Sequence, residues 1–271
     1  QLGYSEKPCL IVAHSLGGMY QQVFAARQSQ WVKAAVFIDD ANACSIQSYL
    51  DRVEGKKRSL FLRYLNDILI HVQQAPFPNT IPLIDIIASQ KQDDSGNRDT
   101  ITENMWIRCH KAFVAESAQR ELVIANCVGH QIFDDNPLLV LFAITQQYVN
   151  YLASSDDEAC WKRLSNYAQS MLAFSQFKES ICADGKDDYT HWALDLRQRA
   201  ELINSIQLLR FTLILHPNDV IALNHLADAY VDLDHLEEAI QLYERVLQVD
   251  AQNEHALMQI QEYKPILFQN K

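Results

Sequence analysis

Ile11-Val-Ala-His-Ser-Leu-Gly-Gly18 is the stretch of sequence that decides the fold. An apolar run typical of a buried strand ends close to a serine, two glycines follow, and the next residues have the spacing of a helix. A bend this sharp brings the residues two before and two after the serine together, so both must be small. They are Ala13 and Gly17. The pattern predicts a strand, a strained turn that lifts the Ser15 hydroxyl clear of the sheet, and a helix.

A reactive hydroxyl at Ser15 needs a base to accept its proton and an acid to orient that base. His130 has the setting expected of the base, because it follows Gly129 in a loop between a predicted strand and a predicted helix. The backbone amide of Leu16, at the start of the helix after the serine, is expected to point to where an oxyanion would form. A plainer interpretation is an ordinary strand-to-helix turn, at which glycines are also common.

Apolar runs alternate with segments of helical spacing in the first part of the chain. The runs expected to be strands lie at 9–13, 31–39, 81–88 and 121–128, and the later helical segments lie at 44–75, 103–118 and 137–152. Strands that alternate with helices predict an α/β fold with a parallel sheet. From about residue 154 the strand pattern stops, so we expect one domain over 1–153 and an all-α domain over 154–271.

The second domain contains an internal repeat. Asn204–Asp219 and Glu238–Asn253 align at a shift of 34 residues, and Ala227 and Ala239 are small where two helices of a repeat must approach closely. A 34-residue period in a helical segment resembles the tetratricopeptide (TPR) family. The resemblance is strongest over 223–253, and the alternative is a generic helical bundle. Such repeats imply a binding surface for a protein partner.

The first domain resembles the α/β-hydrolase family over residues 5–150. The resemblance rests on the motif Ala-His-Ser15-Leu-Gly-Gly, the apolar run that ends at Asp39, and His130 followed by Asp135 and Pro137, which stand in that order. The family implies Ser15 as nucleophile and His130 as base, acting on an ester, thioester or amide through an acyl-enzyme. It also implies that 44–80 forms a helical cap over a pocket for a small acyl substrate.

The acid of the triad is open at this level. The family places it after either of two strands, and Asp39 is the preferred candidate because it ends the strand next to that of Ser15. Asp40 follows directly, and Asp93 or Asp94 comes after the third apolar run, several residues late and in a polar loop. Asp134 and Asp135 are expected to brace the histidine loop or to cap the following helix.

The family also predicts a missing part. Its members have about four strands before the strand of the serine, whereas eight residues precede Cys9 here. We therefore expect a fragment that lacks roughly 80–100 residues, a figure based on typical strand and connection lengths. That part would supply the second oxyanion donor.

Composition narrows the functions further. The formal charge of −11 argues against binding nucleic acid or anionic membranes through bulk electrostatics. No run reaches the roughly 18 apolar residues of a membrane span. The six cysteines are scattered without a C-x-x-C pair, which predicts free thiols, a reducing compartment and a cytoplasmic location. Neither a metal-binding motif nor a nucleotide-binding motif is found, so no cofactor is expected.

Two functions are thus expected from the sequence. The first is a serine hydrolase with a Ser15, His130 and Asp39 triad, joined to TPR-like repeats. The alternative is a non-catalytic interaction scaffold, in which the repeats carry the function and the hydrolase part is vestigial.

Overall fold

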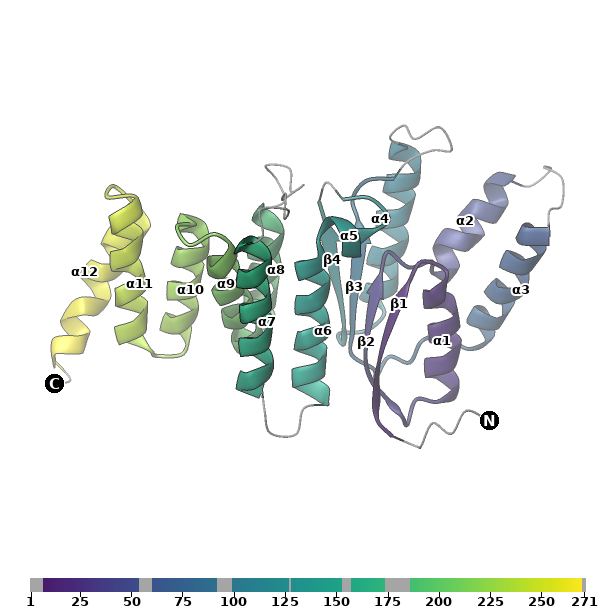
Figure 1. Cartoon of the computed structure of the whole chain (residues 1–271), viewed down its shortest axis with the longest axis horizontal. Coiled ribbons are helices and arrows are strands. Elements are labelled where there is room, and N and C mark those ends of the chain that lie inside the picture. Colours follow the sequence, from purple (N-terminus) through teal and green to yellow (C-terminus); the bar gives the residue numbers. More distant parts are fainter. Residues whose placement is uncertain are drawn as a thin grey trace. The chain divides into compact units, whose positions relative to one another are not determined.

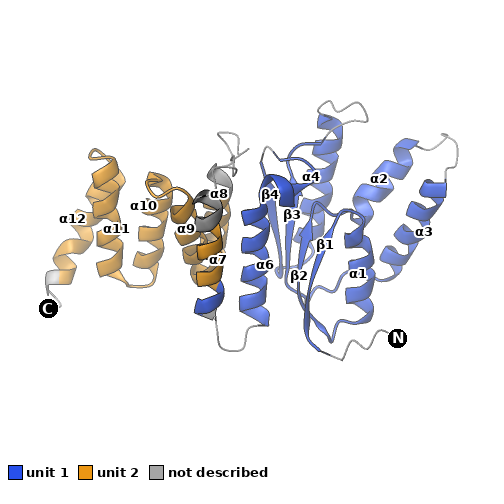
Figure 2. Ribbon diagram, viewed as in Figure 1, with its two compact units in different colours: residues 1–160, 179–185 blue, residues 161–178, 186–271 orange. Residues whose placement is uncertain are grey.

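The computed structural model describes residues 7–53, 60–91, 99–126, 128–152, 157–173 and 186–269 (Figure 1). The chain divides into two compact units. Unit 1 comprises Gln1–Cys160 and Glu179–Gly185, and unit 2 comprises Trp161–Lys178 and Lys186–Lys271 (Figure 2). The α7 helix (Asp157–Ala173) runs from the first into the second.

Unit 1 is built on four parallel strands in the order β1-β2-β3-β4. Its strands are β1 (Cys9–His14), β2 (Val32–Ile38), β3 (Leu83–Ala88) and β4 (Arg120–Ala125). Its helices are α1 (Gly17–Arg27), α2 (Ala43–Val53), α3 (Leu60–Gln74), α4 (Thr100–Ala115), α5 (Ile132–Asp135) and α6 (Pro137–Tyr151). The predicted α/β class with a parallel sheet is confirmed at this coarse level.

The strands are covered by helices on both faces, which explains their nearly continuous apolar sequences. The α6 helix packs on one face, whereas α1 packs on β1 and β2, and α4 on β3 and β4, on the other face (Figure 1). The parallel register pairs Ala13 with Phe37 and Ala88 with Ala125, so that neighbouring strands end at the same level. Their carboxyl ends therefore meet at one edge of the sheet, where Ser15, Asp39 and the loop of His130 lie.

The segment expected to be helical over 44–75 contains two helices, α2 and α3, and residues 54–59 between them lie outside the described part. The α3 helix lays Leu65 and Leu69 against Met19 of α1, and all three side chains are buried. The fourth strand ends at Ala125, earlier than expected, and the short α5 helix follows the histidine loop. The apolar spacing in the sequence did not show that the segment 44–75 contains two helices, or that the fourth strand ends at Ala125.

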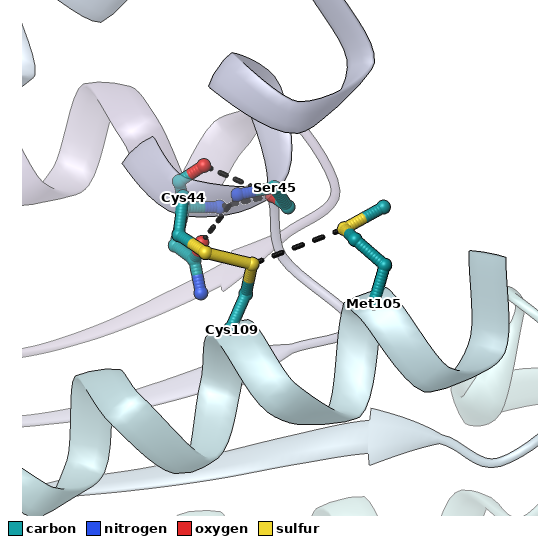
Figure 3. The surroundings of a disulfide bond; sticks show 5 residues. Cys44, Ser45, Met105 and Cys109 are labelled. Atoms are coloured by element: carbon teal, nitrogen blue, oxygen red, sulfur yellow. Dashed lines mark hydrogen bonds between the residues drawn. A yellow bond between two sulfur atoms is a disulfide. The ribbon is translucent and has the colours of Figure 1, made fainter. Parts of the chain in front are cut away.

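A disulfide bond joins Cys44 at the start of α2 to Cys109 in α4 (Figure 3). Cys109 is fully buried and Cys44 is exposed, and the sulfur of Met105 lies 3.8 Å from Cys109 Sγ. The prediction that the cysteines are free thiols is therefore wrong for this pair, and the argument from cysteines to a reducing compartment no longer holds. The 65 residues between the two cysteines concealed the pairing, because only the packing of α2 on α4 brings them together.

Cys9 and Cys160 are free, whereas Cys127 and Cys182 lie outside the described residues. Among the helices that the structure describes, none is both long and apolar enough to cross a membrane.

Unit 2 is helical throughout its described residues. After the end of α7 come α8 (Lys186–Gln198), α9 (Leu202–Leu215), α10 (Val220–Asp232), α11 (Leu236–Val249) and α12 (Glu254–Gln269). Each of these helices packs on the next along the chain. Ala227 of α10 and Ala239 of α11 are fully buried, as is Tyr243 of α11. Residues 174–185 lie outside the described part.

Candidate active site

Ser15 lies between β1 and α1 in the left-handed backbone region, with φ of 57°. A residue with a side chain rarely adopts this conformation, and it persists only where the surroundings hold it. Here the Ser15 amide donates to the Ile38 carbonyl at 3.3 Å. The Ser15 carbonyl accepts from the amides of Gly18 at 3.1 Å and Ala41 at 3.0 Å. The end of β2 and the first turn of α1 thus fix the strained turn on which the serine stands.

The close approach within this turn occurs at Gly18. A Cβ atom on Gly18 would lie 2.3 Å from Asp40 Oδ2, whereas one on Gly17 would meet no other atom within 4 Å. The expectation that position 17 must be small is therefore wrong for this structure. The restriction applies one residue later, because the first turn of α1 rests on the loop after β2.

Leu16 is the N-cap residue of α1, with helical φ and ψ of −60° and −19°. Backbone amides at the start of a helix have no acceptor within the helix, so they are available to a ligand or a developing anion. The oxyanion role expected of the Leu16 amide stays a prediction.

His130 reaches the serine from the loop after β4. Its Nε2 lies 3.0 Å from Ser15 Oγ, and its Nδ1 lies 2.6 Å from Asp39 Oδ2. An ionised carboxylate only accepts hydrogen bonds, so Nδ1 carries the proton and Nε2 is left as the acceptor for the serine hydroxyl. The His130 side chain is 45% exposed, while that of Asp39 is fully buried. His130 is therefore accessible from solvent, whereas Asp39 is not.

The loop that carries His130 is braced from two sides. His14 Nε2 lies 3.0 Å from the His130 carbonyl oxygen, and the centroids of the two rings are 4.5 Å apart. On the other side the Gly129 amide donates to Asp135 Oδ2 at 3.0 Å. Asp135 thus braces the loop, as expected, whereas Asn136 and not an aspartate caps α6. Nothing in the sequence pointed to His14 as a support.

Asp39 accepts four hydrogen bonds, two on each oxygen. Oδ1 accepts from the Ala88 amide at 2.9 Å and from Trp106 Nε1 at 3.0 Å. Oδ2 accepts from His130 and from Lys91 Nζ, which also forms an ion pair with it. Burial alone would raise the pKa of Asp39, but the His130 hydrogen bond and the Lys91 charge outweigh burial and lower the pKa. Asp39 is therefore held ionised, and its own φ of 43° is again left-handed.

The structure distinguishes between the alternative candidates for the acid that contacts His130. Asp40 points away from His130 toward Asp85 and His110, and Asp93 and Asp94 lie outside the described residues. Ser15, His130 and Asp39 are the candidates that the fold brings together. Sequence reasoning missed Lys91 and Trp106, because neither belongs to a motif, and only the packing of α4 beside β3 carries Trp106 to the carboxylate.

Asp40, Asp85 and His110 form a second cluster next to Asp39, and all three are fully buried. Their possible ligand atoms lie within 4.8 Å of one another, but His110 Nδ1 and Asp85 Oδ2 are 2.6 Å apart. That separation is a hydrogen-bond distance, shorter than expected between two ligands of one metal ion. Burial and the charge of Asp85 raise the pKa of Asp40 well above its ordinary value. We interpret the cluster as a protonated Asp40 beside the hydrogen-bonded pair of Asp85 and His110.

Replacing Asp40 by asparagine is expected to stabilise the protein increasingly as the pH rises. The pKa of Asp40 is higher in the folded state, so folding retains a proton, and this contribution to stability is lost as the pH rises through the folded pKa. Asparagine cannot ionise and still offers an N–H donor to Asp85. Urea unfolding at pH 5 and pH 8 measures this, and a variant whose relative stability fell at pH 8 would contradict the assignment.

Neither a comparison with models of known protein families nor a search of curated proteins found a match to this chain.

Proposed function

We propose that this chain carries the catalytic centre of a serine hydrolase of the α/β-hydrolase type, which cleaves an ester, thioester or amide. The observation that carries the proposal is the continuous chain from Ser15 Oγ through the His130 ring to Asp39, with steps of 3.0 and 2.6 Å. Asp39 and Ser15 are 91 and 115 residues from His130 in sequence, and yet all three residues lie at the carboxyl edge of the sheet. Sites of open α/β folds lie at this edge.

Each residue then has a chemical role. His130 Nε2 takes the hydroxyl proton as Ser15 Oγ bonds to the carbonyl carbon, and the carbonyl oxygen becomes an oxyanion near the Leu16 amide. When the tetrahedral intermediate collapses, the bond to the leaving group breaks and the leaving group receives the proton from His130. A water molecule, deprotonated by His130 in the same way, then hydrolyses the acyl-enzyme and restores the serine. Asp39 stays ionised throughout and stabilises the imidazolium.

A fluorophosphonate probe tests this proposal, because it reacts with activated serines by losing fluoride to form a phosphonyl-serine. We expect one adduct, which mass spectrometry assigns to Ser15, and no adduct in the Ser15→Ala variant. Ser165→Ala, a serine whose hydroxyl donates to the Trp161 carbonyl at 2.9 Å within α7, is the matched control and should label as wild type does. A folded protein that is not labelled, or is labelled equally in Ser15→Ala, would contradict the proposal.

Unit 2 supports a second, compatible proposal, which is a TPR-like module that binds a protein partner. The supporting observation is that helix starts recur at the shift found in the sequence. The α8, α10 and α12 helices begin at Lys186, Val220 and Glu254, and α9 and α11 begin at Leu202 and Leu236. In both series each helix therefore begins 34 residues after the previous one, as in stacked helical repeats.

A further inference from the structure

A Ser-His-Asp triad requires no fourth residue, and yet Lys91 lies in contact with the carboxylate of Asp39. Its ammonium group contacts Asp39 Oδ2, the same oxygen that accepts from His130 Nδ1. The Lys91 side chain is only 11% exposed, and Nζ lies 3.9 Å from the centroid of the Trp106 ring. Its backbone amide donates to Glu103 Oε1 at 3.1 Å. The lysine is therefore held in place from both ends and is not a solvated surface group.

The position of the ammonium group has an electrostatic consequence for the base. A carboxylate stabilises an adjacent imidazolium through its negative charge, and a cation at the same oxygen cancels much of that effect. Because both partners use Oδ2, the charge of Asp39 is shared between Lys91 and His130. The Ala88 and Trp106 donors at Oδ1 are neutral, so they hold the carboxylate without competing for its charge.

We infer that Lys91 is a positioning residue that shares the charge of Asp39 with His130, so that Asp39 stabilises the imidazolium less than it would if His130 were its only charged partner. The inference rests on the proposed function, in which His130 acts as base. Burial lowers the pKa of Lys91, although the charge of Asp39 opposes that effect. The ion pair with Asp39 therefore keeps the Lys91 ammonium group protonated at a buried position, where a lysine without a partner would tend to lose its proton.

Other ionisable groups surround this pair, and each belongs to a neighbouring element. They are Asp40 after β2, Asp85 in β3, Glu103 and His110 in α4, and His14 in β1. Asp85 and His110 largely compensate each other through their 2.6 Å contact. Lys91 is thus the cation in direct contact with Asp39 among the residues that the structure describes.

Replacing Lys91 by methionine tests the inference, because methionine has a similar length and no charge. We expect the acid limb of the kcat/KM profile for p-nitrophenyl acetate to move to higher pH by roughly one unit, as for the loss of one nearby charge. The matched variant Lys91→Arg keeps the charge and should keep the wild-type midpoint. Lys91→Gln replaces the methionine variant if that variant does not fold.

A second measurement separates this inference from the proposed function. In protein labelled with ¹³C-histidine, the His130 ring signal is assigned by its absence in His130→Gln, and its titration midpoint should rise in Lys91→Met. If the wild type hydrolyses no ester and binds no fluorophosphonate, the proposed function fails while this titration still decides the role of Lys91. An unchanged midpoint in Lys91→Met, or an equal shift in Lys91→Arg, would overturn the inference.

Discussion

Replacing Asp39 by asparagine is expected to lower kcat for an activated ester about 10,000-fold, the typical cost of losing the acid in such a triad. The physical reason is the tautomer of His130. Asp39 Oδ2 accepts the Nδ1 proton at 2.6 Å, which leaves Nε2 free to accept from Ser15 Oγ at 3.0 Å. An amide group that donates toward Nδ1 would favour the other tautomer, in which Nε2 carries the proton and cannot act as base.

The same substitution also disturbs stability, and the two effects must be separated. Asparagine would leave the largely buried Lys91 without its carboxylate partner, and breaking a buried pair from one side costs about 3–5 kcal/mol. The double variant Asp39→Asn with Lys91→Met removes both charges. We expect it to recover most of the lost free energy of unfolding, measured by urea titration, while kcat stays about as low as in the single variant.

Asp40→Asn is the matched control for Asp39→Asn. It changes the neighbouring carboxylate, which is equally buried but does not contact His130. We expect its activity to stay close to that of the wild type. A stable double variant with wild-type kcat, or an equal loss of activity in Asp40→Asn, would contradict the role of Asp39.

Sequence reasoning predicted the strained turn at Ser15 because the relevant restrictions are local, although it expected the close approach at Gly17 and not at Gly18. A strand, a sharp turn and a helix within ten residues leave few ways to place the hydroxyl. His130 and Asp39 could be expected at the same edge, because parallel strands all end there. The choice of Asp39 over Asp40 depended on which way each side chain leaves the end of β2, and the sequence alone left that open.

What the sequence could not predict depends on contacts between distant elements. The Cys44–Cys109 bond, the hydrogen bond from Trp106 to Asp39 and the buried pair of His110 with Asp85 all involve α4. That helix carries no motif, and its position over β3 and β4 follows from the packing of the whole unit. A periodicity shows that a helix has an apolar face, but it does not show which polar side chains on that face will find partners.

In unit 2 the helix starts recur at the repeat length found in the sequence, but the repeat does not show which interaction joins the helices. Asp228 in α10 accepts hydrogen bonds from the Tyr243 hydroxyl of α11 at 2.6 Å and from His255 Nε2 of α12 at 2.8 Å. Arg197 of α8 lies 3.4 Å from its other oxygen. One carboxylate thus contacts three neighbouring helices.

Replacing Asp228 by asparagine is expected to reduce the local stability of α10–α12 by about 3 kcal/mol, because it weakens several charge-assisted hydrogen bonds at a largely buried site. Burial would raise the pKa of Asp228, but His225 at 3.8 Å and the hydrogen bonds from Tyr243 and His255 outweigh burial and lower the pKa. The contribution to stability is therefore present above the unfolded pKa of about 4 and is lost as the pH falls below it.

Hydrogen exchange followed by mass spectrometry on the full chain measures this loss where it occurs. At pH 7 the amides of α12 should exchange about 100-fold faster in Asp228→Asn than in the wild type, as expected for a local destabilisation of this size. Asp232→Asn is the matched control, because Asp232 lies one turn later in α10 and its carboxylate pairs with Arg197 at a more exposed position. That pair should contribute less than about 1 kcal/mol. Equal exchange in both variants would mean that apolar packing, and not the Asp228 carboxylate, joins the last three helices.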